Sequence, residues 1–283
     1  MTVGDAFVLI RQDLQAVSGE REAAAIADLL LEHITGLSRL DRILYKEREL
    51  TKEQESEFSQ ARERLLNGEP LQYVTGIQWF LSRPFRVSPQ VLIPRPETEE
   101  LVHWIVEDHE KDQPLKVIDI GTGSGCIPVS LKLELPATEV MGIDLSEGAL
   151  EMAKQNTASL GAVVDFRKMN FLNDQEWEQL DRFDIIISNP PYIPLTEKAS
   201  MDAHVKDHEP SMALFVEDSD PLIFYRHIAM FGNLNLEAGG AVYCEIHRDS
   251  GPQVVHLFRE AGYAEVVLRQ DIQGNDRMIR ARK

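Results

Sequence analysis

Short apolar runs alternate with amphipathic helical patterns from about residue 114 to the end of the chain, and this alternation constrains the fold more than any other feature. Strands separated by helices are typical of βαβ units, in which a helix connects two parallel strands. The predicted strands cover residues 116–120, 140–143, 163–167, 185–188, 241–246, 264–268 and 278–281. The predicted helices cover residues 127–135, 147–160, 221–236 and 251–261. We therefore predict an α/β domain with a mostly parallel sheet.

The first part of the chain, up to about residue 75, has a helical pattern and no catalytic motif. Residues 23–31 are rich in helix formers, and Gly36 is a suitable stop for that helix. Thr51 can start a later helix, in which apolar residues recur at helical spacing, namely Phe58, Ala61, Leu65 and Leu66. The pattern predicts a helical bundle, and by itself favours a packing domain over one that docks a partner.

A segment of different character joins these two parts. Residues 77–80 and 85–87 are short β-like runs broken by prolines, so we predict a β-hairpin linker. Thr98 follows the linker and is placed to cap a helix over residues 99–110. The predicted organisation is a helical domain over residues 1–75, a linker over 76–97 and an α/β domain over 98–283.

The composition restricts the possible partners. Net charge is −18 at pH 7, and such a surface repels nucleic acids and anionic membranes. No apolar run is long enough for a membrane span, and the first residues do not have the pattern of a signal peptide. Cys126 and Cys244 have no metal-ligand spacing, so we expect buried free thiols and no metal. We predict a cytoplasmic protein with no direct nucleic-acid or membrane partner.

A glycine loop follows the first predicted strand of the α/β domain. Gly121, Gly123 and Gly125 allow a tight turn and a close approach of the backbone to a ligand. Asp144 ends the next strand, about 20 positions further on, where a carboxylate can accept both hydroxyls of a ribose. The dinucleotide fingerprint needs a glycine where this chain has Cys126, and the chain has no P-loop. The pattern predicts a nucleoside-containing cofactor and resembles motif I of S-adenosylmethionine-dependent methyltransferases.

Two more residues are candidates for contact with this cofactor. Asp119 precedes the loop and either orients the glycines or reaches an amino group of the cofactor. Phe171 follows the third predicted strand and either packs on an adenine face or belongs to the core. Position alone leaves both pairs of alternatives open.

The tetrapeptide Asn189-Pro190-Pro191-Tyr192 follows the predicted strand over residues 185–188. Two prolines stop a strand and stiffen the backbone. In open α/β sheets, ligands bind at the carboxyl ends of the strands. A polar side chain, rigid carbonyls and an aromatic ring therefore stand together where chemistry is expected. The tetrapeptide alone is equally compatible with a plain turn, but together with the glycine loop and Asp144 it favours a methyltransferase.

These motifs together resemble the HemK/PrmC family, the peptide-chain release factor glutamine methyltransferases. The matching stretches are residues 92–99, 119–125, 144, 189–192, 208–210, 213–214 and 274–277, so the resemblance covers nearly the whole chain. It implies a class I S-adenosylmethionine-dependent methyltransferase fold, doubly wound, with seven strands of which the last is antiparallel. It also implies methyl transfer to the glutamine of the Gly-Gly-Gln motif in bacterial class 1 release factors, with S-adenosylhomocysteine as the second product.

The resemblance also assigns roles to residues. The cofactor contacts of the family fall on Gly121, Thr122, Gly123, Ser124, Gly125, Asp144, Phe171 and Asn189. Its substrate contacts fall on Asn189, Pro190, Pro191 and Tyr192, with Asn189 and Pro190 as the catalytic pair. The stretch Phe215-Val216-Glu217-Asp218 stands where relatives often have Phe-Gly-Gly, which leaves the conformation of that loop open.

The chemistry of a carboxamide explains why such residues are needed. Its nitrogen is a poor nucleophile because the lone pair is delocalised into the carbonyl group. Two acceptors, the Asn189 side-chain oxygen and the Pro190 carbonyl, can hold both N–H groups and stabilise the positive charge that develops on nitrogen. The helical domain is then expected to help dock the release factor, and we expect a monomer.

Three alternatives remain open. A glutamine methyltransferase of a ribosomal protein shares the tetrapeptide, although the residues 93–98 favour the release-factor branch. An adenine-amino methyltransferase acts on a similarly conjugated nitrogen, but it needs an extruded base and a basic groove, which the net charge disfavours. A catalytically inactive binding module is disfavoured by the intact motifs.

Overall fold

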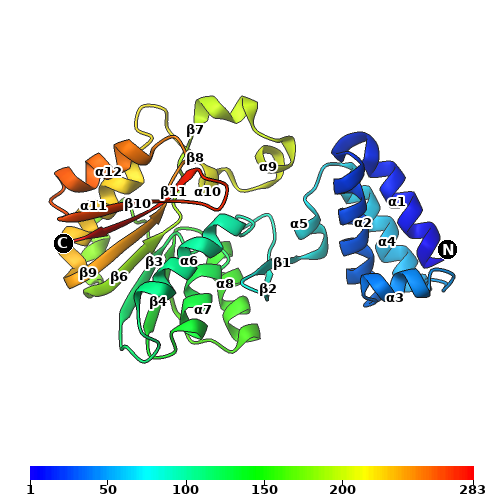
Figure 1. Ribbon diagram of the computed structural model, residues 1–283, viewed down its shortest axis with the longest axis horizontal. Helices are drawn as coiled ribbons and strands as arrows, with labels where there is room; N and C mark the ends of the chain where they lie inside the picture. Colours follow the sequence, from blue (N-terminus) through cyan, green and yellow to red (C-terminus); the bar gives the residue numbers. More distant parts are fainter. The chain divides into compact units, whose positions relative to one another are not determined.

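The computed structural model describes residues 1–283, except for the side chains of Val17 and Ala203 (Figure 1). The chain forms two compact units. The first consists of Met1–Ile77 with the short segment Asp202–His208, and the second of Gln78–Met201 with Glu209–Lys283. The segment 202–208 lies within residues 98–283, so the predicted α/β domain contributes chain to the helical unit.

The first unit is the predicted helical bundle. Its helices are α1 (Val3–Ser18), α2 (Glu20–Thr35), α3 (Arg39–Leu44), α4 (Lys52–Leu66), α5 (Leu71–Thr75) and α9 (Ala203–His208). Thr2 and Thr51 cap α1 and α4 through capping boxes, which satisfy backbone N–H groups at both helix starts. The predicted stop at Gly36 is confirmed by its left-handed conformation after α2. Apolar side chains of α1, α2 and α4 form one core.

The predicted hairpin is formed by β1 (Ile77–Phe80) and β2 (Arg83–Arg86), and the second unit begins within it, at Gln78. Helix α6 follows over Pro96–Asp108 and starts earlier than predicted, with Arg95 as its N-cap. The predicted capping role of Thr98 is therefore wrong. Pro96 suits the first helical turn because it has no N–H to satisfy, and this places Thr98 inside the helix, 2% exposed.

A seven-stranded sheet forms the centre of the second unit, in the order β10-β11-β9-β6-β3-β4-β5. The strands are β3 (Lys116–Ile120), β4 (Glu139–Asp144), β5 (Asp165–Lys168), β6 (Phe183–Ser188), β9 (Leu236–Glu245), β10 (Glu265–Gln270) and β11 (Asp276–Arg282). Neighbours from β5 to β9 are parallel, and β11 is antiparallel to both β9 and β10. The predicted mostly parallel sheet with an antiparallel last strand is confirmed.

Helices cover both faces of this sheet (Figure 1). Helices α6, α7 (Cys126–Glu134) and α8 (Glu147–Leu160) pack on one face, and α11 (Ile223–Asn235) and α12 (Gly251–Glu260) on the other. Successive strand residues point to opposite faces, so Ile186 joins one hydrophobic core while Ile185 and Ile187 join the other. This explains why the strands read as continuous apolar runs.

The strand order reverses between β3 and β6. From β3 the chain proceeds to β4 and β5 on one side, whereas β6 leads to β9 on the other. Ile120 is paired with Ser188, and the Ser188 hydroxyl donates to the Ile120 carbonyl at 2.7 Å. The glycine loop and the Asn-Pro-Pro-Tyr tetrapeptide thus leave the sheet side by side, at the switch point where open α/β sheets bind ligands.

Short elements complete the unit around this edge. They are η1 (Asp174–Gln179), β7 (Ile193–Pro194), η2 (Leu195–Ser200), α10 (Ser211–Leu214) and β8 (Phe215–Val216), and β7 pairs with β8 in a parallel bridge. Among the helices that the structure describes, none combines the length and the apolar character needed to cross a bilayer.

Candidate active site

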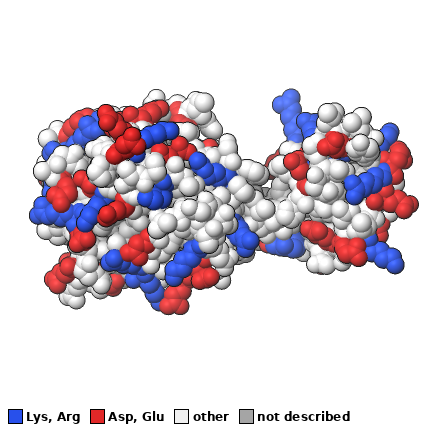
Figure 2. Space-filling view, turned by 90° about the horizontal axis from the view of Figure 1, so that it is seen from below, with Lys and Arg blue, Asp and Glu red and all other residues white. Residues whose placement is uncertain are grey.

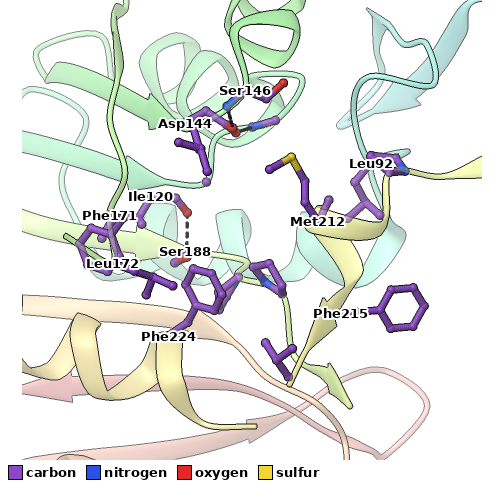
Figure 3. Close-up of a pocket in the computed structure, with 18 of the residues that line it drawn as sticks. Leu92, Ile120, Asp144, Ser146, Phe171, Leu172, Ser188, Met212, Phe215 and Phe224 are labelled. Carbon is purple, nitrogen blue, oxygen red and sulfur yellow. Dashed lines mark hydrogen bonds between the residues drawn. The ribbon is translucent and has the colours of Figure 1, made fainter. Parts of the chain in front are cut away.

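A cavity of about 530 Å³ opens at the carboxyl ends of β3, β4 and β6. Its size is in the range of small-molecule and cofactor sites. In Figure 3, Leu92 and Met212 lie on one side of the cavity, and Phe171 and Leu172 lie on the opposite side. The predicted site residues that line it are Gly121, Gly123, Asp144, Phe171, Asn189, Pro190 and Pro191. The structure therefore brings the glycine loop, the strand-end carboxylate and the first three residues of the tetrapeptide to one cavity.

The glycine loop is held close to β4 by backbone hydrogen bonds. The N–H groups of Gly121 and Thr122 donate to the Ile143 carbonyl at 2.9 and 3.0 Å. Gly121, Gly123 and Gly125 all have positive φ, which side chains rarely tolerate. A Cβ at Gly121 or Gly123 would meet nothing within 4 Å, which leaves space for a ligand against the backbone. Thr122 and Ser124 are buried and do not line the cavity.

Asp144 is anchored by two backbone N–H groups. Its Oδ2 accepts from Gly123 and its Oδ1 from Ser146, both at 2.9 Å. Burial raises the pKa of Asp144, and these backbone hydrogen bonds oppose the rise. Each oxygen still has a lone pair for a further donor. The carboxylate is thus fixed at the cavity wall in a geometry that suits a pair of hydroxyl groups.

Asp119 is fully buried beneath the glycine loop. Neither carboxylate oxygen has a hydrogen-bond partner among the described residues. Burial raises the pKa of Asp119 to about 7; the nearby Thr122 hydroxyl, which does not complete a hydrogen bond, offsets part of this rise, and the charge of Asp144 adds to it. An unpaired buried carboxylate is costly, and it attracts a cation or a donor. This arrangement fits a cofactor that has a positively charged group near the loop.

Phe171 belongs to the core and also lines the cavity. Its ring stacks on Trp177 at 5.3 Å between centroids, and its carbonyl accepts from the indole N–H of Trp177. The ring therefore contacts both Trp177 and Phe231, and Phe171 also lines the cavity. The two roles that position alone left open are therefore compatible with each other.

The side chain of Asn189 is held by a chain of hydrogen bonds that the sequence did not reveal. Its Nδ2 donates to Thr98 Oγ1 at 3.1 Å, and the Thr98 hydroxyl donates to Glu245 Oε2 at 2.6 Å. Tyr192 donates from its hydroxyl to Glu245 Oε1 at 3.0 Å. Glu245 is 1% exposed, and burial raises its pKa, while the hydrogen bonds from Thr98 and Tyr192 and the charge of Arg277 oppose the rise.

This network places Tyr192 differently from the other residues of the tetrapeptide. Its hydroxyl points to Glu245, and it does not line the cavity. The sequence pattern predicts a helix cap for Thr98 and no role for Glu245. One signal was available for Glu245: a carboxylate in the otherwise apolar run over residues 241–246 requires partners if it is buried.

The matching stretches over residues 92–99 and 208–210 also meet in the structure. Glu209, a buried carboxylate, accepts from the Ile93 N–H at 3.2 Å and pairs with Arg95 at 2.5 Å. This bond holds the entry to α6 beside the chain that leads to α10. Val91, Leu92 and Pro210 next to these residues line the cavity, so the ion pair supports its wall.

The stretch Phe215-Val216-Glu217-Asp218, whose conformation the sequence left open, forms a strand followed by a turn. Phe215 and Val216 form β8, which pairs with Ile193 and Pro194. Asp218 Oδ1 accepts from both the backbone N–H and the hydroxyl of Thr196, at 2.9 and 3.0 Å. The strand pairing and these two hydrogen bonds hold the chain that follows the tetrapeptide in place. Residues 215–217 also line the cavity.

Comparison with known proteins agrees with this geometry. Residues 5–76 match the family model described as PrmC N-terminal domain, and residues 111–235 match the model described as methyltransferase domain. A release factor glutamine methyltransferase of Bacteroides thetaiotaomicron is 42% identical over 274 residues, which cover 97% of this chain and 98% of that protein. One from Flavobacterium psychrophilum is 39% identical, with 95% of each chain covered.

A solved structure supports the fold. The hMettl16 catalytic domain in complex with MAT2A 3'UTR hairpin 6 superposes with a TM-score of 0.56 at 17% identity, covering 80% of this chain and 81% of that one. This likeness and the strand order show the fold, and the match of residues 111–235 to the methyltransferase domain model defines the second unit as a class I methyltransferase. The near full-length relatives are more specific, and the chain belongs to the family of release factor glutamine methyltransferases.

Proposed function

We propose that this enzyme transfers a methyl group from S-adenosylmethionine to the glutamine side-chain amide in the Gly-Gly-Gln motif of bacterial class 1 release factors. The proposal is supported above all by the hydrogen bonding of the Asn189 side-chain amide. Its Nδ2 is engaged by Thr98, and its Oδ1 accepts no hydrogen bond from the described residues. A free acceptor on a held side chain, at the wall of the cavity, is what the N–H of a bound amide needs.

The cavity has the groups that this cofactor requires. Asp144 is proposed to accept the ribose hydroxyls, and Phe171 to pack beside the adenine. The glycine loop is proposed to lie against the methionine part through Gly121 and Gly123, whereas Thr122, Ser124 and Gly125 do not line the cavity. Asp119 does not line it either, and its buried, unpaired carboxylate is proposed to attract the amino group of the cofactor through the loop. When bound, S-adenosylmethionine supplies an electrophilic methyl group on a sulfonium that leaves as a neutral thioether.

The protein then contributes orientation and electrostatics. Asn189 Oδ1 and the Pro190 carbonyl are proposed to accept the two N–H groups of the substrate amide. Proline has no N–H, so its carbonyl is presented without a competing donor at that residue. Holding nitrogen and methyl carbon about 3–3.5 Å apart in line lowers the barrier, and the two acceptors stabilise charge as it develops on nitrogen.

The helical unit is proposed to dock the release factor, because a single glutamine side chain offers little area for recognition. Its match to the PrmC N-terminal domain supports this role. We propose that the reaction takes place in the cytoplasm, and the two free and buried cysteines are in keeping with this location. The adenine alternative is disfavoured by the surface in Figure 2, where acidic and basic side chains are interspersed and no continuous basic groove is visible on that face.

Incubation with labelled S-adenosylmethionine and a panel of acceptors tests the proposal. The panel contains a release factor, the same factor with its Gly-Gly-Gln glutamine changed to glutamate, ribosomal proteins and single-stranded DNA. Label is expected in the unaltered release factor and to disappear with the glutamate variant, which keeps the shape of the side chain but lacks the NH₂ group. Label in a ribosomal protein or in DNA, with none in the release factor, would refute the proposed substrate and support the corresponding alternative.

A further inference from the structure

In the buried hydrogen bonds that join Asn189, Thr98 and Glu245, the donor and the acceptor of each bond are defined, and this determines how the Asn189 amide is oriented. The Thr98 hydroxyl has one proton, and that proton is donated to Glu245 Oε2 at 2.6 Å. Towards Asn189 the same hydroxyl presents lone pairs, so it can only accept. It therefore pairs with the Nδ2 of Asn189, at 3.1 Å, and cannot pair with its Oδ1.

Glu245 determines this direction because it accepts from both sides. Its Oε2 receives the Thr98 proton and its Oε1 receives the Tyr192 proton, so each carboxylate oxygen has one hydroxyl donor. The backbone at this point is held as well, since the Tyr225 hydroxyl donates to the Glu245 carbonyl at 3.1 Å. Both Thr98 and Glu245 are almost completely buried, so water does not compete for these bonds.

We propose that Thr98 and Glu245 are positioning residues that fix the Asn189 side-chain amide in one of its two orientations, with the oxygen towards the substrate. This inference rests on the proposed function for its substrate but not for its geometry. An asparagine amide rotated by 180° has nearly the same shape, and packing alone distinguishes the two orientations poorly. Hydrogen bonding distinguishes the two orientations, because the Thr98 hydroxyl accepts from the NH₂ group of Asn189 and has no proton left for its oxygen.

The wrong orientation would remove the acceptor from the site. An Asn189 turned over would present its NH₂ group to the NH₂ group of the substrate, so two sets of donors would face each other. The substrate amide would lose one of its two acceptors, and the developing positive charge would meet the positive end of a dipole. Thr98 and Glu245 therefore contribute to the rate by holding the orientation of the Asn189 amide, although neither residue touches the reacting atoms.

The network joins three segments that are far apart in the chain. Thr98 lies in the first turn of α6, Glu245 at the end of β9 and Asn189 just after β6, separated by 91 positions between Asn189 and Thr98 and by 147 between Thr98 and Glu245. The ionisable groups that interact with Glu245 include Glu97, Cys126, Tyr192, Tyr225 and Arg277.

Substitution of Thr98 tests the proposal directly. Thr98→Val keeps the shape and removes the acceptor, and Thr98→Ser keeps the hydroxyl. We expect Thr98→Val to lower kcat on release factor about 10- to 100-fold, because a freely rotating Asn189 amide no longer holds its acceptor towards the substrate, with an unchanged Kd for S-adenosylmethionine. Thr98→Ser should recover most of that loss. The matched control is Thr157→Val. Thr157 is also a buried threonine in a helix, but its hydroxyl donates to the Ala153 carbonyl of its own helix and not to Glu245.

A second variant tests the direction of the chain. In Glu245→Gln the new amide can donate to Thr98, which frees the Thr98 proton to bond Asn189 Oδ1 and turn the amide over. We expect a loss of kcat, and no additional loss when Thr98→Val is combined with it, because both act through Asn189. Additive losses, or a wild-type kcat for Thr98→Val, would refute a positioning role.

A measurement without substrate separates this proposal from the proposed function. The side-chain ¹⁵N–¹H signals of Asn189 in the whole enzyme are identified by their absence in Asn189→Ala. In the wild type and Thr98→Ser, one amide proton should exchange slowly with solvent; in Thr98→Val, that protection should be lost. Protection unchanged by Thr98→Val overturns the positioning proposal, whereas failure of the wild type to methylate release factor overturns only the function.

Discussion

The buried carboxylate of Asp119 is expected to destabilise the ligand-free enzyme as pH rises, and Asp119→Asn should remove this effect. In the folded state burial raises the pKa of Asp119 from 3.8 to about 7. Between these two values the folded state holds a proton that the unfolded state has released. The unfolding free energy therefore decreases with increasing pH in this interval, and this contribution is greatest in acid and lost as pH rises through about 7.

The size of the effect follows from the two pKa values. The difference between a pKa of about 7 in the folded state and 3.8 in the unfolded state lowers the unfolding free energy by about 4 kcal/mol once the group is fully ionised in both states. Integrating between pH 5 and pH 8 gives roughly 2.5 kcal/mol of lost stability for the wild type. In Asp119→Asn the side chain is neutral at both values. An unpaired buried amide has its own cost of about 1–3 kcal/mol, but that cost is the same at pH 5 and pH 8 and cancels.

Urea denaturation followed by tryptophan fluorescence measures the unfolding free energy of the second unit, which contains Asp119. Trp79, Trp104 and Trp177 all lie in the second unit, so the signal reports on the methyltransferase fold and not on the helical unit. The quantity of interest is the change in unfolding free energy between pH 5 and pH 8, in the variant and in the wild type. Asp112→Asn, at an exposed loop position, is the control for the loss of one negative charge.

The expected result is a pH-dependent gap between Asp119→Asn and the wild type that grows by roughly 2.5 kcal/mol from pH 5 to pH 8. A gap that stays constant within about 0.5 kcal/mol would show that Asp119 is not desolvated in the ligand-free enzyme, since surface substitutions scatter by this amount. The same reasoning predicts that saturating S-adenosylmethionine reduces the gap, because a cation beside Asp119 stabilises the charged form.

Three further predictions concern the rest of the site. Asn189→Ala should fold and bind cofactor but lose roughly 10²–10³ in kcat on release factor, and wild-type turnover would contradict the acceptor role. Asp144→Ala should weaken S-adenosylmethionine binding about 10- to 100-fold by calorimetry, the worth of hydrogen bonds to a charged group, and an unchanged Kd rejects the ribose role. Gly125→Ala should cost more stability in denaturation than Gly161→Ala, because both have positive φ but only the first puts a Cβ at 3.0 Å from Ala153. Costs of about 1–2 kcal/mol for Gly161→Ala and clearly more for Gly125→Ala are expected, and equal costs would remove the close-packing argument.

The alternation of apolar runs and helical patterns was sufficient to predict the sheet. All seven strands and the four helices between them lie where the periodicity places them, with boundaries that differ by a few residues. Buried parallel strands are short and continuously apolar, so their signal does not depend on distant contacts. The antiparallel last strand came from the family resemblance, and the pairing of β11 between β9 and β10 agrees with it.

The helix start at Thr98 shows where local reasoning failed. Threonine before a helical pattern is a good cap, and Arg95 is not. The helix nevertheless begins at Pro96, and this frees the Thr98 hydroxyl to bond Glu245. A tertiary hydrogen bond that involves a buried carboxylate outweighs the preference for a cap, and nothing within a few residues of Thr98 reveals its existence.

The amino-acid sequence by itself determined the order of the elements, the glycine loop, the strand-end Asp144 and the rigid Asn-Pro-Pro-Tyr, because each depends on a local property of the backbone or on a short spacing. Only the tertiary structure decided how the Asn189 amide is oriented, which carboxylate stays unpaired and which segment joins the helical unit. These features depend on contacts between residues far apart in the chain. Desolvation and hydrogen-bond direction arise only when such residues are brought together in a buried place.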